Sequence, residues 1–517
     1  MKELVYHRFL LPVVERLPGK TALRDGDFSV TYEQHLDRVL RLGDAIRAAG
    51  VGPGERFAVM ALNGHEFLEL YHASLLTGTV MNPLNLRLAP KELEFILRDS
   101  GCRLCFADGF FGAAIDQVRH DAGLEQVVLL GAGDVPHDAI YEELLSSGEA
   151  RMPPEPDEDA AGILMYTGGT TGLPKGVVLD QRALMIDVYK VSTRWVLRED
   201  YVYLHQTPMF HAASLGGVLA VPAAGGTSTT IPLFSPEGAI DAIERFEVTM
   251  TVMVPTMVAM MLDHPAFDRE RLRSLRILTY GASPMPPVLL ERALAALPGV
   301  DFYQGYGMTE NCGLLTCLGP DEHRRGGDIL RSAGQPMPGT VVCIKDEDGR
   351  ILARGETGEV CARAGNYMRE YWNRPEETAE AFRDGWYHTG DAGYMDSDGY
   401  VYLVDRVKDM IVTGGENVYS AEVENAISSH PAVAQVAVIG IPSDQWGEAV
   451  HAVVVRQPGA TVTEEELKAW ARDRIAGYKV PKSIDFRDEP LPLSGAMKIL
   501  KRELRAPFWQ GRDIDVQ

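Results

Sequence analysis

Residues 166–177 read Tyr-Thr-Gly-Gly-Thr-Thr-Gly-Leu-Pro-Lys-Gly-Val, a loop rich in glycine and threonine between two apolar runs. Glycines at 168, 169 and 172 let the backbone turn its N–H groups toward an anion, and the threonine hydroxyls add donors without charge. Lys175 supplies one full positive charge. Because residues 162–166 and 176–179 are apolar enough to form buried strands, the stretch predicts a hairpin-like flap that binds polyphosphate.

This flap differs from a Walker A loop, in which the lysine follows a glycine, precedes Ser or Thr and opens a helix. Here Pro174 precedes Lys175 and Gly176 follows it. A glycine-rich surface loop without a ligand is the alternative interpretation of the pattern alone.

The stretch resembles the phosphate-binding signature of adenylate-forming enzymes, the superfamily of acyl-CoA synthetases, luciferases and peptide-synthetase adenylation domains. It departs from the signature at Gly168, where most members carry Ser. The resemblance implies an α/β fold with a large N-terminal domain of doubly wound sheets and a small β-barrel-like subdomain, residues 1–405. A smaller, mobile α+β C-terminal domain, residues 406–517, is expected to follow, with its hinge at Lys408.

The local patterns agree with this fold. Thr31 and Gln34 predict a capping box for a helix that runs to Gly50, and a strand is expected at 57–62. Helices near 65–75 and 90–99 are each followed by short apolar runs, a rhythm that predicts βαβ units and a mostly parallel sheet. Helical and strand patterns at 421–428, 433–439, 451–455 and 464–475 predict a separate αβ module.

Composition excludes several classes of function. The 517 residues include 45% apolar and 24% charged residues, and the net charge is −23, which disfavours nucleic acids and anionic membranes as partners. Apolar stretches are too short for a membrane-spanning segment or a secretory core, so a cytoplasmic protein is predicted. Cys102 and Cys105 form a C-x-x-C pair without a second pair at zinc spacing, and two buried thiols are the favoured interpretation.

The second motif is Tyr306-Gly307-Met308-Thr309-Glu310. A hydroxyl beside a carboxylate suits magnesium, which prefers hard oxygens and bridges phosphates. By resemblance, Glu310 and Thr170 hold Mg²⁺ and Thr309 contacts the α-phosphate. A solvated glutamate after a turn is the alternative for Glu310 alone.

The third motif, residues 386–391, ends in Asp391, a carboxylate that can accept both ribose hydroxyls. The resemblance assigns Asp391 this task and makes Arg406 its partner. The bend Gly281-Ala282-Ser283 follows an expected strand at 276–279, and in the family it contacts adenine and the acyl group.

The acyl pocket is expected beside Phe210-His211, which offers no Asp to anchor the ammonium group of an amino acid. A lone histidine is more often structural, but by resemblance His211 lies at the mouth of this pocket. The methionine-rich run 249–262 is by default core packing. As an adaptable apolar pocket wall, it supports an alkyl substrate ahead of an aryl or polycyclic one.

The C-terminal motifs concern the thiol and the catalytic lysine. Gly414 and Gly415 lie in a loop that lines the pantetheine tunnel in the family. Lys498 falls on the catalytic lysine by resemblance. Met497 stands where glycine is usual, which puts the shape of that loop in question.

These motifs predict an AMP-forming acid–thiol ligase, an acyl-CoA synthetase of fatty acid metabolism that uses ATP, Mg²⁺ and coenzyme A with a small carboxylic acid. Alternatives are an aryl- or polycyclic-acid ligase, an enzyme of one half-reaction such as an acyl-AMP ligase that loads a carrier protein, a luciferase-like oxidase and a non-catalytic nucleotide-binding protein. The oligomeric state is left open, with a homodimer among the alternatives. The predicted catalytic residues are Lys498, Glu310, Thr170 and His211. The predicted binding residues are Thr167, Gly168, Gly169, Thr170, Thr171, Gly172, Lys175, Gly281, Ala282, Ser283, Tyr306, Gly307, Thr309, Asp391, Arg406, Gly414 and Gly415.

Overall fold

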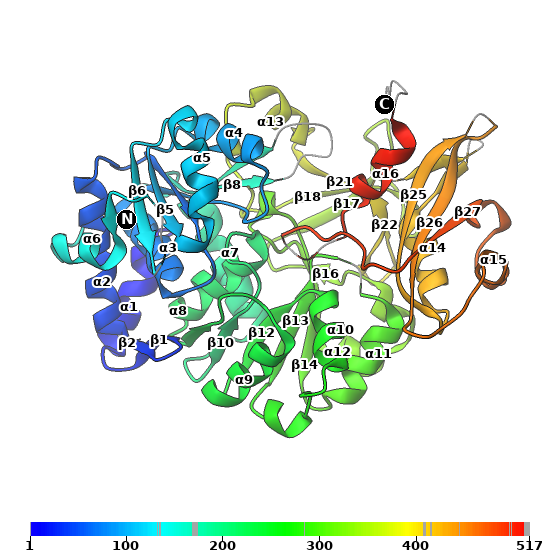
Figure 1. Cartoon of the computed structure of the whole chain (residues 1–517), viewed down its shortest axis with the longest axis horizontal. Coiled ribbons are helices and arrows are strands. Elements are labelled where there is room, and N and C mark those ends of the chain that lie inside the picture. The colour runs from blue at the N-terminus through cyan, green and yellow to red at the C-terminus, as the bar shows by residue number, and fades with distance from the viewer. Residues whose placement is uncertain are drawn as a thin grey trace.

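The computed structural model describes residues 2–131, 133, 136–167, 174–283, 285–406, 410–413, 416–443, 445–495, 497 and 499–510. Within these residues the chain is mixed α/β, with a large N-terminal domain and a smaller C-terminal domain (Figure 1). The C-terminal strands and the last helix lie together at one side of the molecule. The predicted fold class is confirmed.

The first sheet of the N-terminal domain has nine strands, and its central pairs are parallel. The outer pairs β1–β2, β14–β15 and β15–β16 are antiparallel. In order across the sheet, the strands are β16 (Gln335–Pro336), β15 (Thr316–Leu318), β14 (Asp301–Tyr306), β13 (Ile277–Gly281), β12 (Met250–Met253), β10 (Val202–His205), β11 (Thr227–Thr230), β1 (Thr21–Asp25) and β2 (Phe28–Thr31).

The second sheet has eight strands and is again mostly parallel, which confirms the prediction of βαβ units. In order, the strands are β19 (Glu370–Tyr371), β9 (Lys175–Asp180), β8 (Ala161–Thr167), β4 (Val80–Pro83), β3 (Arg56–Met60), β5 (Leu104–Asp108), β6 (Gln126–Leu130) and β7 (Ala139–Ile140). The strands β8, β9 and β19 at one edge pair antiparallel.

Two five-stranded sheets complete the fold. An antiparallel sheet stands where the small barrel-like subdomain was expected: β17 (Val341–Lys345), β18 (Gly358–Arg363), β21 (Trp386–Met395) and β20 (Phe382–Arg383), with β22 (Val401–Arg406) on β21. The C-terminal sheet contains β24 (Glu416–Val418), β23 (Ile411–Thr413), β26 (Gly447–Arg456) and β25 (Val433–Ser443), with β27 (Ser483–Arg487) on β26.

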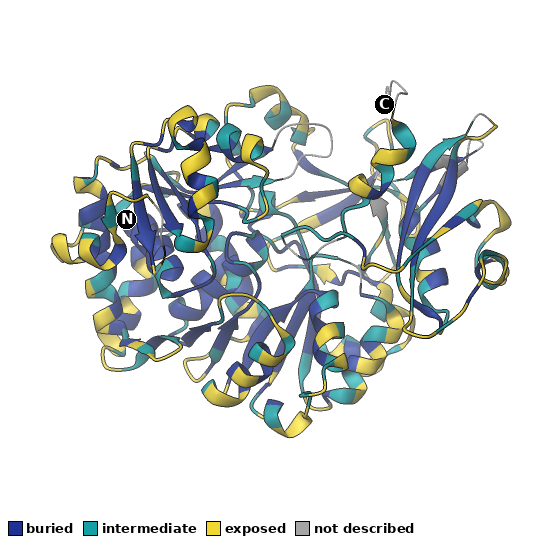
Figure 2. Ribbon diagram, in the orientation of Figure 1, coloured by how far each residue is buried: buried dark blue, intermediate teal, exposed yellow. Residues whose placement is uncertain are grey.

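Helices cover the sheets and turn their apolar faces inward, so that buried residues lie on the strands and inner helix faces (Figure 2). The helices are α1 (His7–Arg16), α2 (Tyr32–Ala48), α3 (His65–Thr77), α4 (Pro90–Ser100), α5 (Gly112–Ala122), α6 (Tyr141–Ser147), α7 (Gln181–Trp195), α8 (Val221–Ala223), α9 (Pro236–Phe246), α10 (Pro255–Asp263), α11 (Pro287–Ala296), α12 (Pro320–Arg325), α13 (Pro375–Ala381), α14 (Ser420–Ser428), α15 (Glu464–Arg472) and α16 (Lys501–Trp509). Short turns of helix include η2 (Ala212–Ser214), η3 (Gly216–Ala220) and η5 (Thr309–Asn311).

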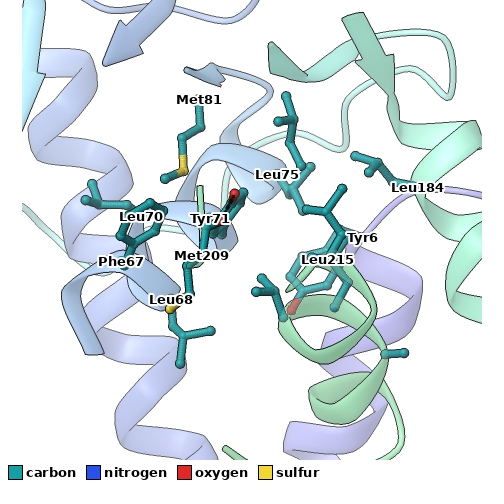
Figure 3. Close-up of a cluster of buried hydrophobic side chains, with 14 of the residues drawn as sticks. Tyr6, Phe67, Leu68, Leu70, Tyr71, Leu75, Met81, Leu184, Met209 and Leu215 are labelled. Carbon is teal, nitrogen blue, oxygen red and sulfur yellow. Dashed lines mark hydrogen bonds between the residues drawn. The ribbon is translucent and has the colours of Figure 1, made fainter. Parts of the chain in front are cut away.

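Helix α3 is buried over residues 67–76 and forms the centre of the largest hydrophobic cluster. Figure 3 shows Phe67, Tyr71 and Leu75 of this helix beside Met209 and Leu215. The hydroxyl of Tyr71 donates a 2.8 Å hydrogen bond to the carbonyl oxygen of Met209. The helix is buried on all sides, and its hydrogen bond to Met209 anchors the chain two residues before His211.

The local predictions hold with small shifts. The capping box of Thr31 and Gln34 is present, and its helix ends at Ala48 rather than Gly50. The six cysteines are free and buried, as predicted for Cys102 and Cys105. In the part of the chain that the structure describes, no helix is long and apolar enough to cross a membrane.

Candidate active site

The predicted flap is a hairpin up to the loop itself. Strands β8 and β9 pair antiparallel, with Tyr166 opposite Gly176 and Thr167 opposite Lys175. The hydroxyl of Tyr166 donates a 2.7 Å hydrogen bond to Oδ2 of Asp99 in α4, which fixes the start of the flap. Five predicted phosphate-binding residues lie outside the described residues: Gly168, Gly169, Thr170, Thr171 and Gly172.

Lys175 lies against the short strand β19. Tyr371 of this strand pairs with Val177 of β9, and Nζ of Lys175 lies 5.2 Å from the centre of the Tyr371 ring. A cation at that distance over an aromatic face is attracted by the ring quadrupole. The position of the flap lysine is therefore tied to Tyr371.

Glu310, the predicted magnesium ligand, lies in η5, the turn that follows β14. Its backbone carbonyl accepts a 2.6 Å hydrogen bond from the N–H of Met368. Its Oε1 atom accepts a 2.8 Å hydrogen bond from the hydroxyl of Tyr371. Tyr371 thereby joins the first and second motifs.

A buried polar network supports this turn. Nδ2 of Asn366 donates to the carbonyl oxygen of Asn311 at 2.9 Å and to Oδ1 of Asp187 at 3.0 Å. Oδ1 of Asn366 accepts a 2.6 Å hydrogen bond from Nζ of Lys190. Burial raises the pKa of Asp187 to about 7 and lowers the pKa of Lys190 to about 8. Because buried polar groups are stable when hydrogen-bonded, the network holds the backbone beside Glu310.

Asp391, the predicted ribose ligand, lies in β21 and accepts a 2.5 Å hydrogen bond from the hydroxyl of Tyr306 at the end of β14. Burial, and then the charge of Asp391, raise the pKa of Tyr306, so the hydroxyl stays protonated. Arg406 of β22 is opposite Asp391 in the antiparallel ladder. The predicted partners are neighbours in the sheet, and the side chain of Arg406 lies outside the described residues.

The bend at residues 281–283 is closely packed. A Cβ atom on Gly281 would lie 2.2 Å from the carbonyl oxygen of Gly305, so only glycine lets β13 and β14 end this close together. Ala282 has a φ of +67°, a left-handed conformation that costs a non-glycine residue about 1 kcal/mol. Bends at the carboxyl ends of parallel strands are where α/β sheets bind ligands.

His211 follows a loop that one buried asparagine holds. The side chain of Asn63 donates a 3.0 Å hydrogen bond to the carbonyl of Thr207 and accepts a 2.8 Å hydrogen bond from the N–H of Met209. Nδ1 of His211 accepts a 3.3 Å hydrogen bond from the N–H of Ala213 and so caps η2. The imidazole is therefore oriented by its own backbone.

One cleft connects the three motifs. Part of its lining is apolar and comes from Val191 and Trp195 of α7 together with Gly216 and Leu314. The predicted site residues that line this cleft are Thr167, Lys175, His211, Gly281, Ala282, Ser283, Tyr306, Gly307, Thr309, Glu310 and Asp391. Tertiary structure thus brings together residues that the sequence separates by more than 200 positions.

The methionine-rich run contributes to both the core and the cleft, but most of its methionines are in the core. Met253, Met257 and Met261 belong to a buried cluster between α10, β13 and β14, and Met250 is buried in the largest core cluster. Met260 is exposed and lines the cleft. Because residues four apart share one face of a helix, α10 turns Met257 and Met261 to the core together. Core packing is confirmed for these four methionines, while the part of the run that lines the cleft is Val252, Val254, Pro255, Thr256, Ala259 and Met260.

The loop before α16 reaches from the C-terminal domain to the N-terminal domain. Figure 1 shows this segment, in red, running toward the centre of the molecule. Nη1 of Arg87 donates a 2.7 Å hydrogen bond to the carbonyl of Leu493. Oγ1 of Thr256 donates a 3.3 Å hydrogen bond to the carbonyl of Met497. The C-terminal loop therefore forms part of the cleft.

Met497 has a φ of +60°, a conformation that glycine adopts freely. The loop therefore has the shape that the usual glycine would favour, and the methionine stabilises it less by about 1 kcal/mol. Lys498, the predicted catalytic residue, lies outside the described residues, but Met497 and Ile499 both line the cleft.

Three further predicted residues also lie outside the described residues: the hinge Lys408 and the tunnel residues Gly414 and Gly415. The strands on either side of the tunnel residues are β23 and β24, which pair antiparallel with Thr413 opposite Glu416. The roles of these residues stay predictions.

The residues present fit a magnesium ion. Mg²⁺ is commonly held by one or two carboxylates together with substrate phosphates, through oxygen ligands. Glu310 offers a carboxylate at the cleft whose orientation is fixed by Tyr371, and Thr309 beside it also lines the cleft. The donor set is made of hard oxygens, as this cation requires.

Three residues that position the site were not found from the sequence: Tyr371, Asn366 and Asn63. Each acts through hydrogen bonds to residues distant in the chain. For Tyr371, a signal was present in the pair Tyr371-Trp372 ahead of Pro375, aromatic residues in a charged stretch. Nothing in the local pattern singled out the two asparagines.

A family model described as "AMP-binding enzyme" matches residues 12–372, and one described as "AMP-binding enzyme C-terminal domain" matches residues 422–498. The chain belongs to the AMP-binding enzyme family. The predicted membership of the adenylate-forming superfamily is confirmed. Residues 373–421 lie between the two matches, so the domain boundary after 405 stays a prediction.

Two curated relatives of this AMP-binding enzyme cover nearly its whole length. A fatty acid–[acyl-carrier-protein] ligase from Streptomyces coeruleorubidus is 39% identical over 485 residues, 93% of this chain and 92% of that protein. A feruloyl-CoA synthase from Amycolatopsis is 41% identical over 493 residues, 95% of this chain and 96% of that protein. Both are named as ligases that join an acid to a thiol, and the predicted acid–thiol ligase is confirmed.

The fold is also that of solved enzymes. The ATP-bound structure of MatB from Rhodopseudomonas palustris has a TM-score of 0.89 and 28% identity, and covers 99% of each chain. The apo structure of the same protein has a TM-score of 0.78, covering 98% of this chain and 99% of that one. The arrangement of this AMP-binding enzyme is therefore closer to the ATP-bound structure.

Proposed function

We propose that the chain activates an apolar carboxylic acid with ATP and transfers the acyl group to coenzyme A. The observation that carries the proposal is the convergence of Lys175, Glu310, Asp391 and His211 on one cleft. In the first step a carboxylate oxygen attacks the α-phosphate and the bond to pyrophosphate breaks. In the second step the thiol attacks the acyl carbon of the adenylate, AMP leaves, and the thiol proton is released.

Little covalent chemistry falls to the protein in such a transfer, so positioning and charge neutralisation carry the rate. We assign Lys175 and the flap N–H groups to the polyphosphate, Thr309 to the α-phosphate and Asp391 to the ribose hydroxyls. Tyr306 supports Asp391 through its 2.5 Å hydrogen bond. Lys498 is assigned to the carboxylate and the α-phosphate.

Magnesium, when bound, supplies further neutralisation of phosphate charge. Glu310 and Thr170 are the residues that would hold it. Gly281, Ala282 and Ser283 would contact the adenine and the acyl group at the bend between β13 and β14.

Both steps need a site from which water is almost excluded. They differ in the protein groups that must lie beside the reacting atoms. A C-terminal domain that turns about Lys408 would supply Lys498 for the first step and the loop with Gly414 and Gly415 for the second. The contacts of Leu493 and Met497 with the N-terminal domain support the first arrangement.

For the acid, we place a medium or long alkyl chain ahead of an aryl or polycyclic group. The relative named as a fatty acid ligase supports an alkyl acid, and the relative named as a feruloyl-CoA synthase supports an aryl acid. The apolar lining from Val191, Trp195 and Leu314 suits both. An amino acid is disfavoured, because Phe210-His211 offers no carboxylate for its ammonium group.

For the thiol, coenzyme A is the proposed acceptor and the phosphopantetheine of a carrier protein is the second candidate. The second candidate rests on the relative named as an acyl-carrier-protein ligase. Both acceptors present the same thiol arm, so the cleft does not distinguish coenzyme A from a carrier protein.

The test is pyrophosphate release from ATP with a panel of straight-chain, aromatic, steroidal and amino acids, each with and without coenzyme A or a phosphopantetheinylated carrier protein. We expect thioester formation with coenzyme A and the highest kcat/KM for a straight-chain acid, since each buried methylene adds about 0.8 kcal/mol of binding. An amino acid as the best substrate would overturn the assignment of the acyl pocket. Absence of pyrophosphate release with every acid would overturn the function.

A further inference from the structure

Tyr371 stands between two opposite charges of the cleft, Lys175 and Glu310. Its ring lies under the ammonium group of Lys175 at 5.2 Å, and its hydroxyl donates to the carboxylate of Glu310 at 2.8 Å. Among the described residues, Lys175 forms no ion pair. The side chain of Tyr371 is therefore a contact that the two charged groups share.

The backbone fixes the direction in which Tyr371 points. Its strand β19 pairs with β9, and the flanking Trp372 donates a 2.7 Å hydrogen bond from its N–H to the carbonyl of Gly176. The N–H of Tyr371 donates a 3.0 Å hydrogen bond to Oγ1 of Thr378. The indole of Trp372 donates a further 2.8 Å bond to the carbonyl of Asp99. A side chain on such a strand has little freedom to turn.

The hydroxyl of Tyr371 is the donor in its 2.8 Å hydrogen bond to Oε1 of Glu310. A neutral phenol therefore faces the carboxylate and satisfies it without neutralising it. The π face of the same ring attracts the lysine without removing its charge.

We propose that Tyr371 is a positioning residue that orients Glu310 toward the metal ion and Lys175 toward the phosphates of ATP. The inference rests on the proposed function, in which these two residues meet the metal and the polyphosphate. One side chain thus contacts both charged groups, Lys175 through its ring and Glu310 through its hydroxyl, and both contacts are made before ATP and its cation bind.

The test compares three variants. Tyr371→Phe removes only the hydroxyl, and Tyr371→Leu removes the hydroxyl and the π face. Tyr367→Phe is the matched control, because the buried hydroxyl of Tyr367 has no hydrogen-bond partner among the described residues and its ring packs against the same hydrophobic cluster as Tyr371. Thermal unfolding without nucleotide checks that each variant is folded.

The primary measurement is Mn²⁺ binding, followed by electron paramagnetic resonance in the presence of a non-hydrolysable ATP analogue. We expect Tyr371→Phe to weaken Mn²⁺ binding at least about tenfold, the effect of losing one hydrogen bond to a charged group. Tyr371→Leu should in addition weaken binding of the analogue without metal, and Tyr367→Phe should match the wild type. The Mg²⁺ concentration that half-activates ATP–pyrophosphate exchange should rise by the same factor in Tyr371→Phe.

Wild-type Mn²⁺ affinity in a folded Tyr371→Phe would overturn the proposal, as would an equal loss in Tyr367→Phe. If Tyr371→Leu does not fold, Tyr371→Phe decides alone. Absence of pyrophosphate exchange in the wild type would reject the proposed function instead, while the Mn²⁺ titration would still report on Tyr371.

Discussion

The two sides of the cleft are held by different means. On the nucleotide side, Tyr371 is part of a β ladder and Glu310 lies on a turn that Asn366 and Met368 bind from the buried side. On the other side, the loop of residues 491–500 meets the N-terminal domain through hydrogen bonds to its backbone carbonyls, from Arg87 and Thr256.

This difference indicates which side of the cleft keeps its structure through both reaction steps; we call it the permanent side. A strand ladder with a buried network unfolds only with its domain, whereas single hydrogen bonds to backbone carbonyls are worth about 1 kcal/mol each. The nucleotide side is therefore suited to hold ATP throughout, and the loop with Lys498 is suited to leave between the two steps.

The largest effect is expected for Lys498→Ala. If the loop brings this charge to the carboxylate and the α-phosphate only during adenylation, the rate of adenylation should fall at least about a hundred-fold in the variant. Thioester formation from supplied acyl-adenylate should largely survive. The two half-reactions are measured separately by pyrophosphate release and thioester yield, and equal loss in both would contradict the assignment.

The next effect is expected for Lys408→Pro. Proline fixes φ, so a hinge at this position would stiffen and the loop would stay docked. Adenylate should form and accumulate while transfer to coenzyme A falls by at least about tenfold. Quench and chromatography of the bound intermediate measure this, and normal overall turnover would refute the hinge.

A smaller effect is expected for Arg87→Ala, which removes one docking contact of the loop at Leu493. The docked position of the loop should lose roughly 1 kcal/mol of stabilisation. We therefore expect adenylation to slow by about three- to tenfold, whereas transfer from supplied adenylate should not change. Lys91→Ala, an exposed cation in the neighbouring helix α4, is the control. Equal slowing of both steps would show that Arg87 supports the nucleotide side instead.

Met497→Gly should act in the opposite direction. Glycine adopts the φ of +60° without strain, which should favour the docked loop by up to about 1 kcal/mol. We expect adenylation to become up to about fivefold faster. Slower adenylation would show that packing of the methionine side chain outweighs the strain.

The smallest effect concerns the stability of the N-terminal domain. His65, at the start of α3, donates from its ring to Asp25 at 3.0 Å. Burial lowers the pKa of His65, but the hydrogen bond to Asp25 and the charges of Glu66 and Glu69 raise it above 6.5 overall. The stabilisation is therefore present below about pH 6.5 and is lost as the pH rises through the raised value.

His65→Gln should remove this pH dependence and leave both half-reactions unchanged. Urea unfolding between pH 6 and pH 9 should show the difference in unfolding free energy between wild type and variant shrinking as the pH rises. A difference that grows with pH would contradict the sign of the shift.

Much of the fold was determined by local sequence. The capping box of Thr31 and Gln34, the flap strands around residues 166–177 and the alternation of helices and strands depend on neighbouring residues, whose propensities act over a few positions. The identities of Lys175, Glu310 and Asp391 followed from motifs for the same reason, since each motif is a contiguous stretch.

Only tertiary structure decided how these motifs meet. The methionine run shows the limit, because its apolar character did not say which face of α10 would be buried, and the packing of β13 and β14 placed Met257 and Met261 in the core. Likewise, no local pattern indicated that the hydroxyl of Tyr371 would reach Glu310. Hydrogen bonds between residues far apart in the chain exist only once the sheets have formed, so the sequence determined the charges of this cleft and the fold decided what holds them in place.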